Sequence, residues 1–99
     1  MRLTNNQVQT IKQVVAMHAG EGAEVTLFGS RVDDELKGGD IDLLITLKHA
    51  IDHPAVMSSK ISARLVRLFQ GRKVDVLLSA PNLQKFPIHR IAQSTGVIL

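Results

Sequence analysis

The chain has 99 residues, of which 44% are hydrophobic and 21% charged, as expected for one globular domain with a single core and not for a disordered segment. Its 12 lysines and arginines against 9 aspartates and glutamates give a net charge of +3, which favours anionic ligands but does not indicate a nucleic-acid-binding protein. The absence of Cys, Trp and Tyr argues against a disulfide framework, a thiolate zinc site and a base-stacking platform.

The N-terminal stretch MRLTNNQVQTIKQ lacks the apolar segment of a signal peptide, and no apolar run reaches the length of a membrane span. The sequence also contains no repeat, linker or low-complexity segment. We therefore expect a single domain over residues 1–99, located in the cytoplasm and not associated with a membrane.

The first predicted element is a helix that Thr4 or Asn5 can cap and that Gly20 ends. Its apolar side consists of residues at helical spacing: Val8, Ile11, Val15 and His18. The next element is EVTLF (24–28), a short, partly β-branched run between glycines that predicts a strand.

DIDLLITL (40–47) predicts a second strand, which follows a polar loop that holds Gly38 and Gly39. A second helix is expected from about Pro54 to Phe69, with Gly71 beyond its end. Its predicted buried face is Ile61, Leu65, Leu68 and Phe69.

KVDVLLSA (73–80) predicts a third strand, and FPIHRIAQSTG (86–96) predicts a short final helix closed by Gly96. The apolar ending GVIL is expected to be either an edge strand or part of a subunit interface. Together the elements predict an α/β or α+β fold, with a small mixed sheet of three to four strands flanked by helices.

Three aspartates interrupt the predicted strands. Asp40 and Asp42 are two residues apart, so both side chains project from the same face of their strand. Asp75 interrupts the third strand, and neighbouring positions of the second and third strands would bring all three carboxylates together. Because like charges at close range repel, such a cluster calls for a cation, and oxygen ligands suit Mg²⁺.

Gly29 and Ser30 follow the first strand directly. A Gly-Ser turn offers close backbone approach, free N–H groups and one hydroxyl, which together can hold a phosphate. A phosphate-binding turn beside a pair of carboxylate-bound metal ions is suited to phosphoryl or nucleotidyl transfer.

The motif GSRVDDELKGGDIDLLI, followed by KVDVLL, resembles the signature of the DNA polymerase beta nucleotidyltransferase superfamily. That signature comprises a Gly-Ser, about ten residues, an Asp-x-Asp and a third Asp on a later strand. The chain is most similar to the minimal nucleotidyltransferase (MNT) group, and the resemblance covers nearly all of it. It implies a polymerase beta palm-like nucleotidyltransferase fold.

The resemblance also implies roles for individual residues. Gly29 and Ser30 would hold the phosphates of a nucleotide. Asp40 and Asp42 would bind Mg²⁺, and the site would hold two Mg²⁺ ions. Asp75 would share one ion and help to deprotonate the acceptor hydroxyl.

Arg31 could contact the phosphates through its guanidinium group or lie in solvent, and the sequence leaves both readings open. Two features depart from the family pattern. Gly39 stands where the family usually has Ser or Thr, and only nine residues separate Ser30 from Asp40.

Small members of this group resemble antitoxins that are encoded beside a HEPN-domain toxin and silence it by transferring AMP from ATP to a toxin hydroxyl. The resemblance thus implies ATP and a HEPN-type protein as partners, in a homo- or hetero-oligomer. Two alternatives stay open: a catalytically idle antitoxin that acts by complex formation, and transfer to a small molecule or an RNA end.

Two further groups of charged or titratable residues stand outside the motif. His49 and His53 are four apart and could share a helical face, but their surroundings do not indicate a metal site. Lys60, Arg64 and Arg67 form a basic stripe that we interpret as a solvent-facing side of the second helix, with contact to an acidic partner or RNA as the alternative.

Overall fold

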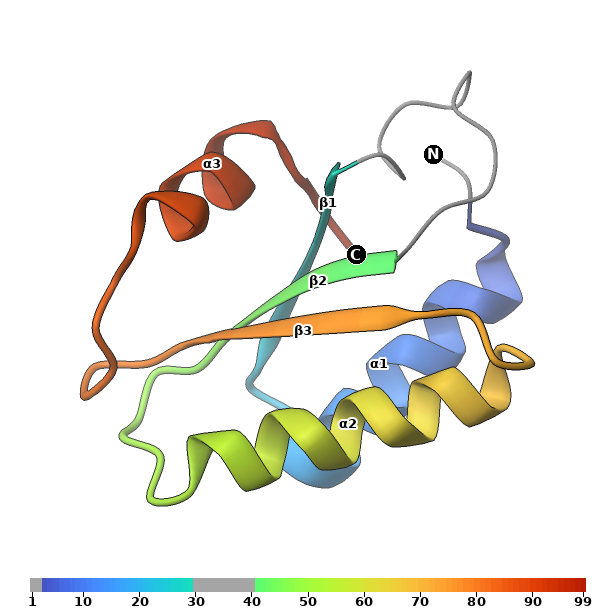
Figure 1. The fold of residues 1–99 in the computed structure, drawn as a ribbon, viewed down its shortest axis with the longest axis horizontal. Coiled ribbons are helices and arrows are strands. Elements are labelled where there is room, and N and C mark those ends of the chain that lie inside the picture. The colour runs from blue at the N-terminus through green and yellow to red at the C-terminus, as the bar shows by residue number, and fades with distance from the viewer. Residues whose placement is uncertain (1–2, 30–40) are drawn as a thin grey trace.

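A computed structural model describes residues 3–29 and 41–99 of the protein (Figure 1). Within these residues the elements, in chain order, are α1 (Asn5–Ala19), β1 (Glu24–Phe28), β2 (Ile41–Thr46), α2 (Pro54–Leu68), β3 (Val74–Ser79), α3 (Pro87–Thr95) and β4 (Val97–Ile98). The predicted helices and strands are therefore confirmed within one or two residues at their ends, and the apolar ending forms a short edge strand.

The strands form one mixed sheet in the order β3-β2-β1-β4. β1 runs antiparallel to both β2 and β4, whereas β2 and β3 are parallel and are joined by α2. Parallel neighbours need such a crossover connection, because a tight turn reverses the chain direction and can join only antiparallel strands. Helices α1 and α2 cover one face of the sheet and α3 lies on the other (Figure 1), which confirms the predicted fold class.

The two faces of β2 pack against different sets of side chains. Leu43 and Ile45 belong to the larger core, which β2 shares with α1 and α2, and both are fully buried. Leu44 points to the other face and packs with Phe28 and with Ala92 of α3. Since side chains alternate along a strand, Asp42 lies on the α3 face together with Leu44.

Helix α1 begins with a capping box between Thr4 and Gln7. The Gln7 backbone N–H donates to Thr4 Oγ1 at 3.1 Å, and the Thr4 N–H donates to Gln7 Oε1 at 2.9 Å. These two bonds satisfy backbone donors that the first helical turn leaves without partners. The buried side of the helix is Ile11, Val14, Val15 and Ala19.

Helix α2 confirms only half of its predicted buried face: Ile61 and Leu65 are buried, whereas Phe69 follows the helix as its C-cap and is partly buried. Leu68 was predicted to be buried with Ile61 and Leu65, but it is 49% exposed. It is the last helical residue, and the chain reverses directly afterwards through Gln70 (φ 59°) and Gly71 (φ 86°), which leaves its side chain at the solvent end of the helix.

His49 and His53 do not share a helical face, because His49 lies in the turn before α2 and His53 occupies the N-cap position. The side chains of the basic stripe on α2 are exposed: Lys60, Arg64 and Arg67. None of the helices in the described part of the chain is long and apolar enough to cross a membrane.

Candidate active site

Two of the three predicted metal-binding carboxylates lie side by side on the sheet. Asp42 of β2 is paired in register with Asp75 of β3, and on its other side with Phe28 of β1. Residues paired in this way project from the same face, and neighbouring strands are about 4.8 Å apart. The expectation that the second and third strands are neighbours is thus confirmed, and both carboxylates lie on the face that carries α3.

The hydrophobic pattern of β3 fixes this register. Val74 is 2% exposed and faces the larger core, whereas Asp75 is exposed on the opposite face. A shift of one residue would turn the Asp75 carboxylate into the core and Val74 into solvent, and burying an unpaired charge is costly. The alternation that buries the valine therefore also places Asp75 beside Asp42.

Gly29 ends β1 immediately beside the Asp42 carboxylate. Its φ of 77° lies in the left-handed region, and a Cβ built on it would collide with Asp42 Oδ2 and lie 3.2 Å from Asp42 Cγ. Only a residue without a side chain fits both the backbone conformation and the space. The glycine of the predicted phosphate-binding turn is thus in contact range of a predicted metal ligand.

The remaining predicted site residues lie outside the described residues: Ser30, Arg31 and Asp40, as does Gly39. Their roles stay predictions from the sequence. Within residues 3–29 and 41–99, no group of three or more His, Asp or Glu side chains is arranged to hold a metal ion. Asp42 and Asp75 are two members of the predicted set, and the third, Asp40, lies outside the described residues.

Lys73 is a charged neighbour that the sequence analysis did not single out. Its Nζ lies 3.8 Å from Asp75 Oδ2, and the two side chains are 66% and 53% exposed. An exposed ion pair of this kind contributes about 0–1 kcal/mol, so an incoming cation or substrate can displace it. The sequence signal was present, because Lys73 and Asp75 are two apart in the predicted strand 73–80, where alternate residues share a face.

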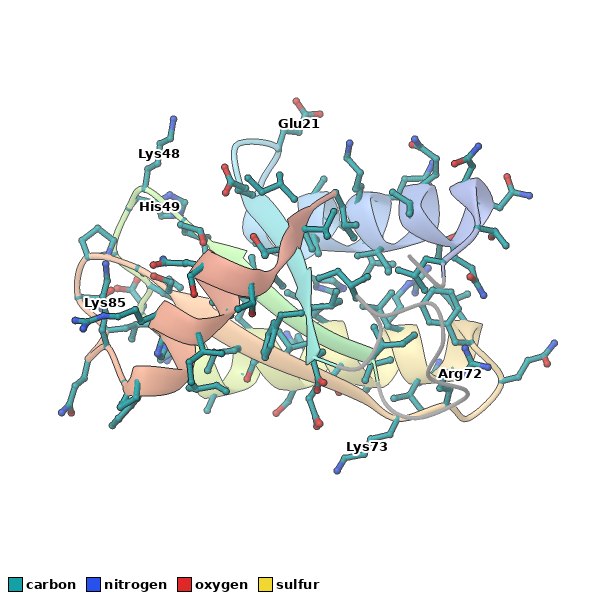
Figure 2. The ribbon with its side chains drawn as sticks, turned by 90° about the horizontal axis from the view of Figure 1, so that it is seen from above. Glu21, Lys48, His49, Arg72, Lys73 and Lys85 are labelled. Atoms are coloured by element: carbon teal, nitrogen blue, oxygen red, sulfur yellow. The ribbon has the colours of Figure 1, made fainter. Side chains whose placement is uncertain are left out.

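Figure 2 shows Lys73 projecting from the lower edge near the middle of the molecule and Arg72 toward the right, whereas Lys48, His49 and Lys85 lie at the left. Among these labelled residues, the cation that contacts a paired carboxylate is Lys73, which directly precedes β3. This arrangement keeps one positive side chain next to Asp75.

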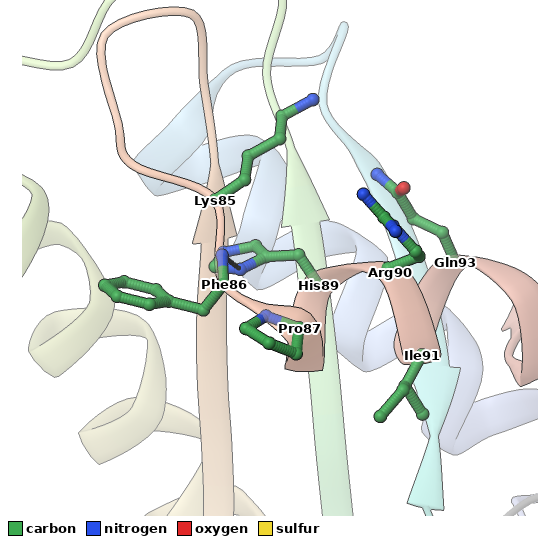
Figure 3. Close-up of a pocket in the computed structure, with 7 residues that line it drawn as sticks. All are labelled: Lys85, Phe86, Pro87, His89, Arg90, Ile91 and Gln93. Carbon is green, nitrogen blue, oxygen red and sulfur yellow. Dashed lines mark hydrogen bonds between the residues drawn. The ribbon is translucent and has the colours of Figure 1, made fainter.

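His89 holds α3 over the carboxylate-bearing face. The Phe86 backbone N–H donates to His89 Nδ1 at 3.0 Å, which assigns the proton to Nε2, and Nε2 donates to the Leu78 carbonyl, also at 3.0 Å (Figure 3). The side chain is 3% exposed, so both bonds are shielded from water. These contacts join the start of α3 to β3 and fix the helix above the sheet.

The donor set of this site fits Mg²⁺. Both described ligand candidates are carboxylates, which a hard divalent cation prefers, and Asp75 is open enough to reach a substrate oxygen. The missing side chain at Gly29 leaves room for the Asp42 carboxylate against the end of β1. The arrangement is typical of proteins that transfer phosphoryl or nucleotidyl groups.

Comparison with protein families agrees with this class. The chain belongs to the nucleotidyltransferase domain family, whose model matches residues 8–95. A search of curated proteins found no match. The predicted membership in the polymerase beta nucleotidyltransferase superfamily is thus confirmed, and the closer likeness to the MNT group stays a prediction.

Proposed function

We propose that the protein is a Mg²⁺-dependent nucleotidyltransferase of the MNT group that transfers AMP from ATP to a hydroxyl of a partner protein. The observation that carries the proposal is the register pairing of Asp42 with Asp75, with Gly29 against Asp42, in a chain of the nucleotidyltransferase domain family. The proposed acceptor is a HEPN-type protein of the cytoplasm, encoded beside this chain and silenced by the modification.

In the proposed reaction, Gly29 and the adjoining Ser30 and Arg31 bind the triphosphate. Asp40 and Asp42, with Asp75, would hold two Mg²⁺ ions, which when bound neutralise the phosphates and lower the pKa of the acceptor hydroxyl. These carboxylates would fix the nucleotide relative to the acceptor.

Asp75 is suited to proton removal because it is the more exposed of the two described carboxylates. It accepts the proton of the acceptor hydroxyl while the hydroxyl oxygen attacks the α-phosphorus. The bond between the α-phosphorus and the bridging oxygen breaks, and pyrophosphate leaves. The products are the AMP-modified partner and pyrophosphate, so atoms and charge balance.

The proposal is tested by incubating the protein with labelled ATP, Mg²⁺ and the purified HEPN-type partner. We expect label on the partner, and a loss of about 10²-fold or more in Asp42→Asn and Asp75→Asn, since each removes a charge that acts on the transition state. Asp52→Asn is the matched control, because Asp52 is an exposed carboxylate in the loop before α2, outside the paired carboxylates.

Two outcomes would contradict the proposal. If Asp42→Asn still transfers AMP, Asp42 is not part of the site. If the wild-type protein transfers no AMP to the HEPN-type partner, the proposed catalytic activity is wrong. Loss of transfer in Asp52→Asn as well would show that the variants act through stability.

Complex formation without catalysis is the competing function, which the departures of the motif from the family pattern, Gly39 and the nine-residue spacing before Asp40, leave open. The same asparagine variants separate the two functions in a toxin-neutralisation assay. Full neutralisation by Asp42→Asn and Asp75→Asn would favour binding, whereas neutralisation lost while the complex persists would favour catalysis.

A further inference from the structure

Helix α3 exposes three large apolar side chains: Phe86 at its N-cap (52% exposed), Ile88 (43%) and Ile91 (53%). We call these residues the α3 ridge. Inside the helix, only His89 and Ala92 are buried against the sheet. Clustered exposed apolar residues on so short an element indicate an interaction surface, in contrast to single exposed residues, which are common.

The α3 ridge and the paired carboxylates lie on the same face of the sheet. Figure 3 shows Pro87 and Ile91 projecting from the side of α3 that faces the end of β1 and the start of β3, and Phe86 extending past β3 in the direction of α2. Ile88 and Ile91 are three residues apart and share a flank of the helix. Gly29 and Asp75 lie at that same end of the sheet, at the end of β1 and the start of β3.

The surface between the ridge and β3 is open. Helix α3 packs mainly on β1 and β2, so it covers little of β3. Asp75 and Leu77 project from the same face of β3, and they are exposed and half-buried, respectively. A partner that contacts the ridge and extends along β3 would therefore cover the face that carries Asp75.

The charge around α3 favours an acidic partner. A hollow of about 500 Å³ at the start of the helix is lined by Lys85, Phe86, Pro87, His89, Arg90, Ile91 and Gln93, which include two cations and no carboxylate. Figure 3 places Lys85, Arg90 and Gln93 on the opposite side of the helix from Ile91. The same two cations on each copy, in a chain of net charge +3, disfavour a second copy of this protein as the occupant.

We infer that the α3 ridge docks the acceptor protein, through an amphipathic segment whose apolar side chains cover Phe86, Ile88 and Ile91. That segment crosses α3, so that its acidic side chains face Lys85 and Arg90 on the opposite side of the helix from Ile91. The inference rests on the proposed function, because it assigns the protein that carries the acceptor hydroxyl to the face of the sheet that carries Asp75. The ridge positions the acceptor and takes no part in the chemical step.

The test measures partner binding without nucleotide, and separately the kinetics of AMP transfer. Ile91→Glu is expected to weaken binding of the HEPN-type partner about tenfold or more and to raise the KM for that partner similarly, with kcat at saturating partner nearly unchanged. Ile91→Ser repeats the test with a small side chain, in case the glutamate disturbs the helix. Arg90→Glu should weaken binding by a smaller factor that shrinks at high salt.

Val56→Glu is the matched control, because Val56 is 51% exposed and lies on α2, on the other side of the sheet. It should bind and transfer as the wild type does. Thermal melting of every variant checks that α3 is still folded.

The outcomes separate the inference from the proposed function. Binding that falls in the ridge variants but not in Val56→Glu supports docking, even if no variant or wild-type protein transfers AMP. Transfer with unchanged KM in Ile91→Glu and Ile91→Ser overturns docking and leaves the proposed function intact. Three further outcomes also overturn docking. They are a rise in the KM for ATP alone, the loss of a wild-type dimer in Ile91→Glu, and no binding of the HEPN-type partner by the wild-type protein.

Discussion

At the scale of single residues, the site depends on a glycine, Gly29, because no larger residue fits beside the Asp42 carboxylate. Gly29 contributes no functional group of its own, yet its left-handed φ and its missing Cβ let the end of β1 approach the Asp42 carboxylate. The motif in the sequence predicted a glycine next to a phosphate. The steric contact with Asp42 could not be predicted, because it depends on the antiparallel pairing of β1 with β2.

Replacing Gly29 with alanine should therefore damage activity more than stability. We expect a loss of about 1 kcal/mol in the free energy of unfolding from the left-handed φ, and a loss of transfer of about 10²-fold, because the new Cβ displaces the Asp42 carboxylate. Urea unfolding and the transfer assay measure the two effects.

Gly71→Ala is the control for backbone strain alone. Gly71 has a similar φ of 86°, but nothing lies within 4 Å of a Cβ built there. It should lose similar stability and keep its transfer activity. Equal activity losses in the two variants would contradict a steric role for Gly29 at Asp42.

At the scale of elements, local patterns predicted most helices and strands, whereas the contacts between them depend on distant parts of the chain. The apolar period, the Thr4 cap and the flanking glycines were sufficient for α1 and α2. The side of the sheet that α3 occupies was not predictable, since it follows from the bonds of His89 to Phe86 and Leu78.

Histidines from distant parts of the sequence also come together. His18 of α1 lines one hollow of about 470 Å³ with His49 and His53, although the sequence pattern placed His18 only on the apolar side of the first helix. The three do not form a metal-binding group within the described residues. Such proximity requires the packing of α1 against the turn before α2, which no local pattern encodes.

The anchoring of α3 yields a stability prediction. His89→Ala leaves the Phe86 N–H and the Leu78 carbonyl without their partner and creates a cavity, so the free energy of unfolding should fall by about 2–3 kcal/mol. Urea unfolding measures the loss, and amide hydrogen exchange should locate the faster exchange in α3. His49→Ala, at an exposed position, should change stability little, and an equally stable His89→Ala variant would contradict the anchoring role.

At the scale of the whole molecule, the two faces of the sheet have different tasks. The face under α1 and α2 holds most of the buried apolar side chains, whereas the face under α3 is only partly covered and carries Asp42 and Asp75. A carboxylate pair on the larger core face would have to be buried, at high cost. The exposed α3 face therefore accommodates a charged site and keeps it open to substrate and partner, while the opposite face supplies the stability.

This separation predicts that ligand binding stabilises the fold through Asp42. With Mg²⁺ and a non-hydrolysable ATP analogue at about ten times its Kd, mass action should add about 1.4 kcal/mol to the free energy of unfolding, equivalent to a rise of about 5–10 °C in Tm. Differential scanning fluorimetry should show this rise in the wild-type protein and in Asp52→Asn, but not in Asp42→Asn. Chelation of Mg²⁺ should abolish the rise, because the carboxylates and the triphosphate would repel each other without the cation. An equal rise in Asp42→Asn would place the nucleotide elsewhere on the molecule.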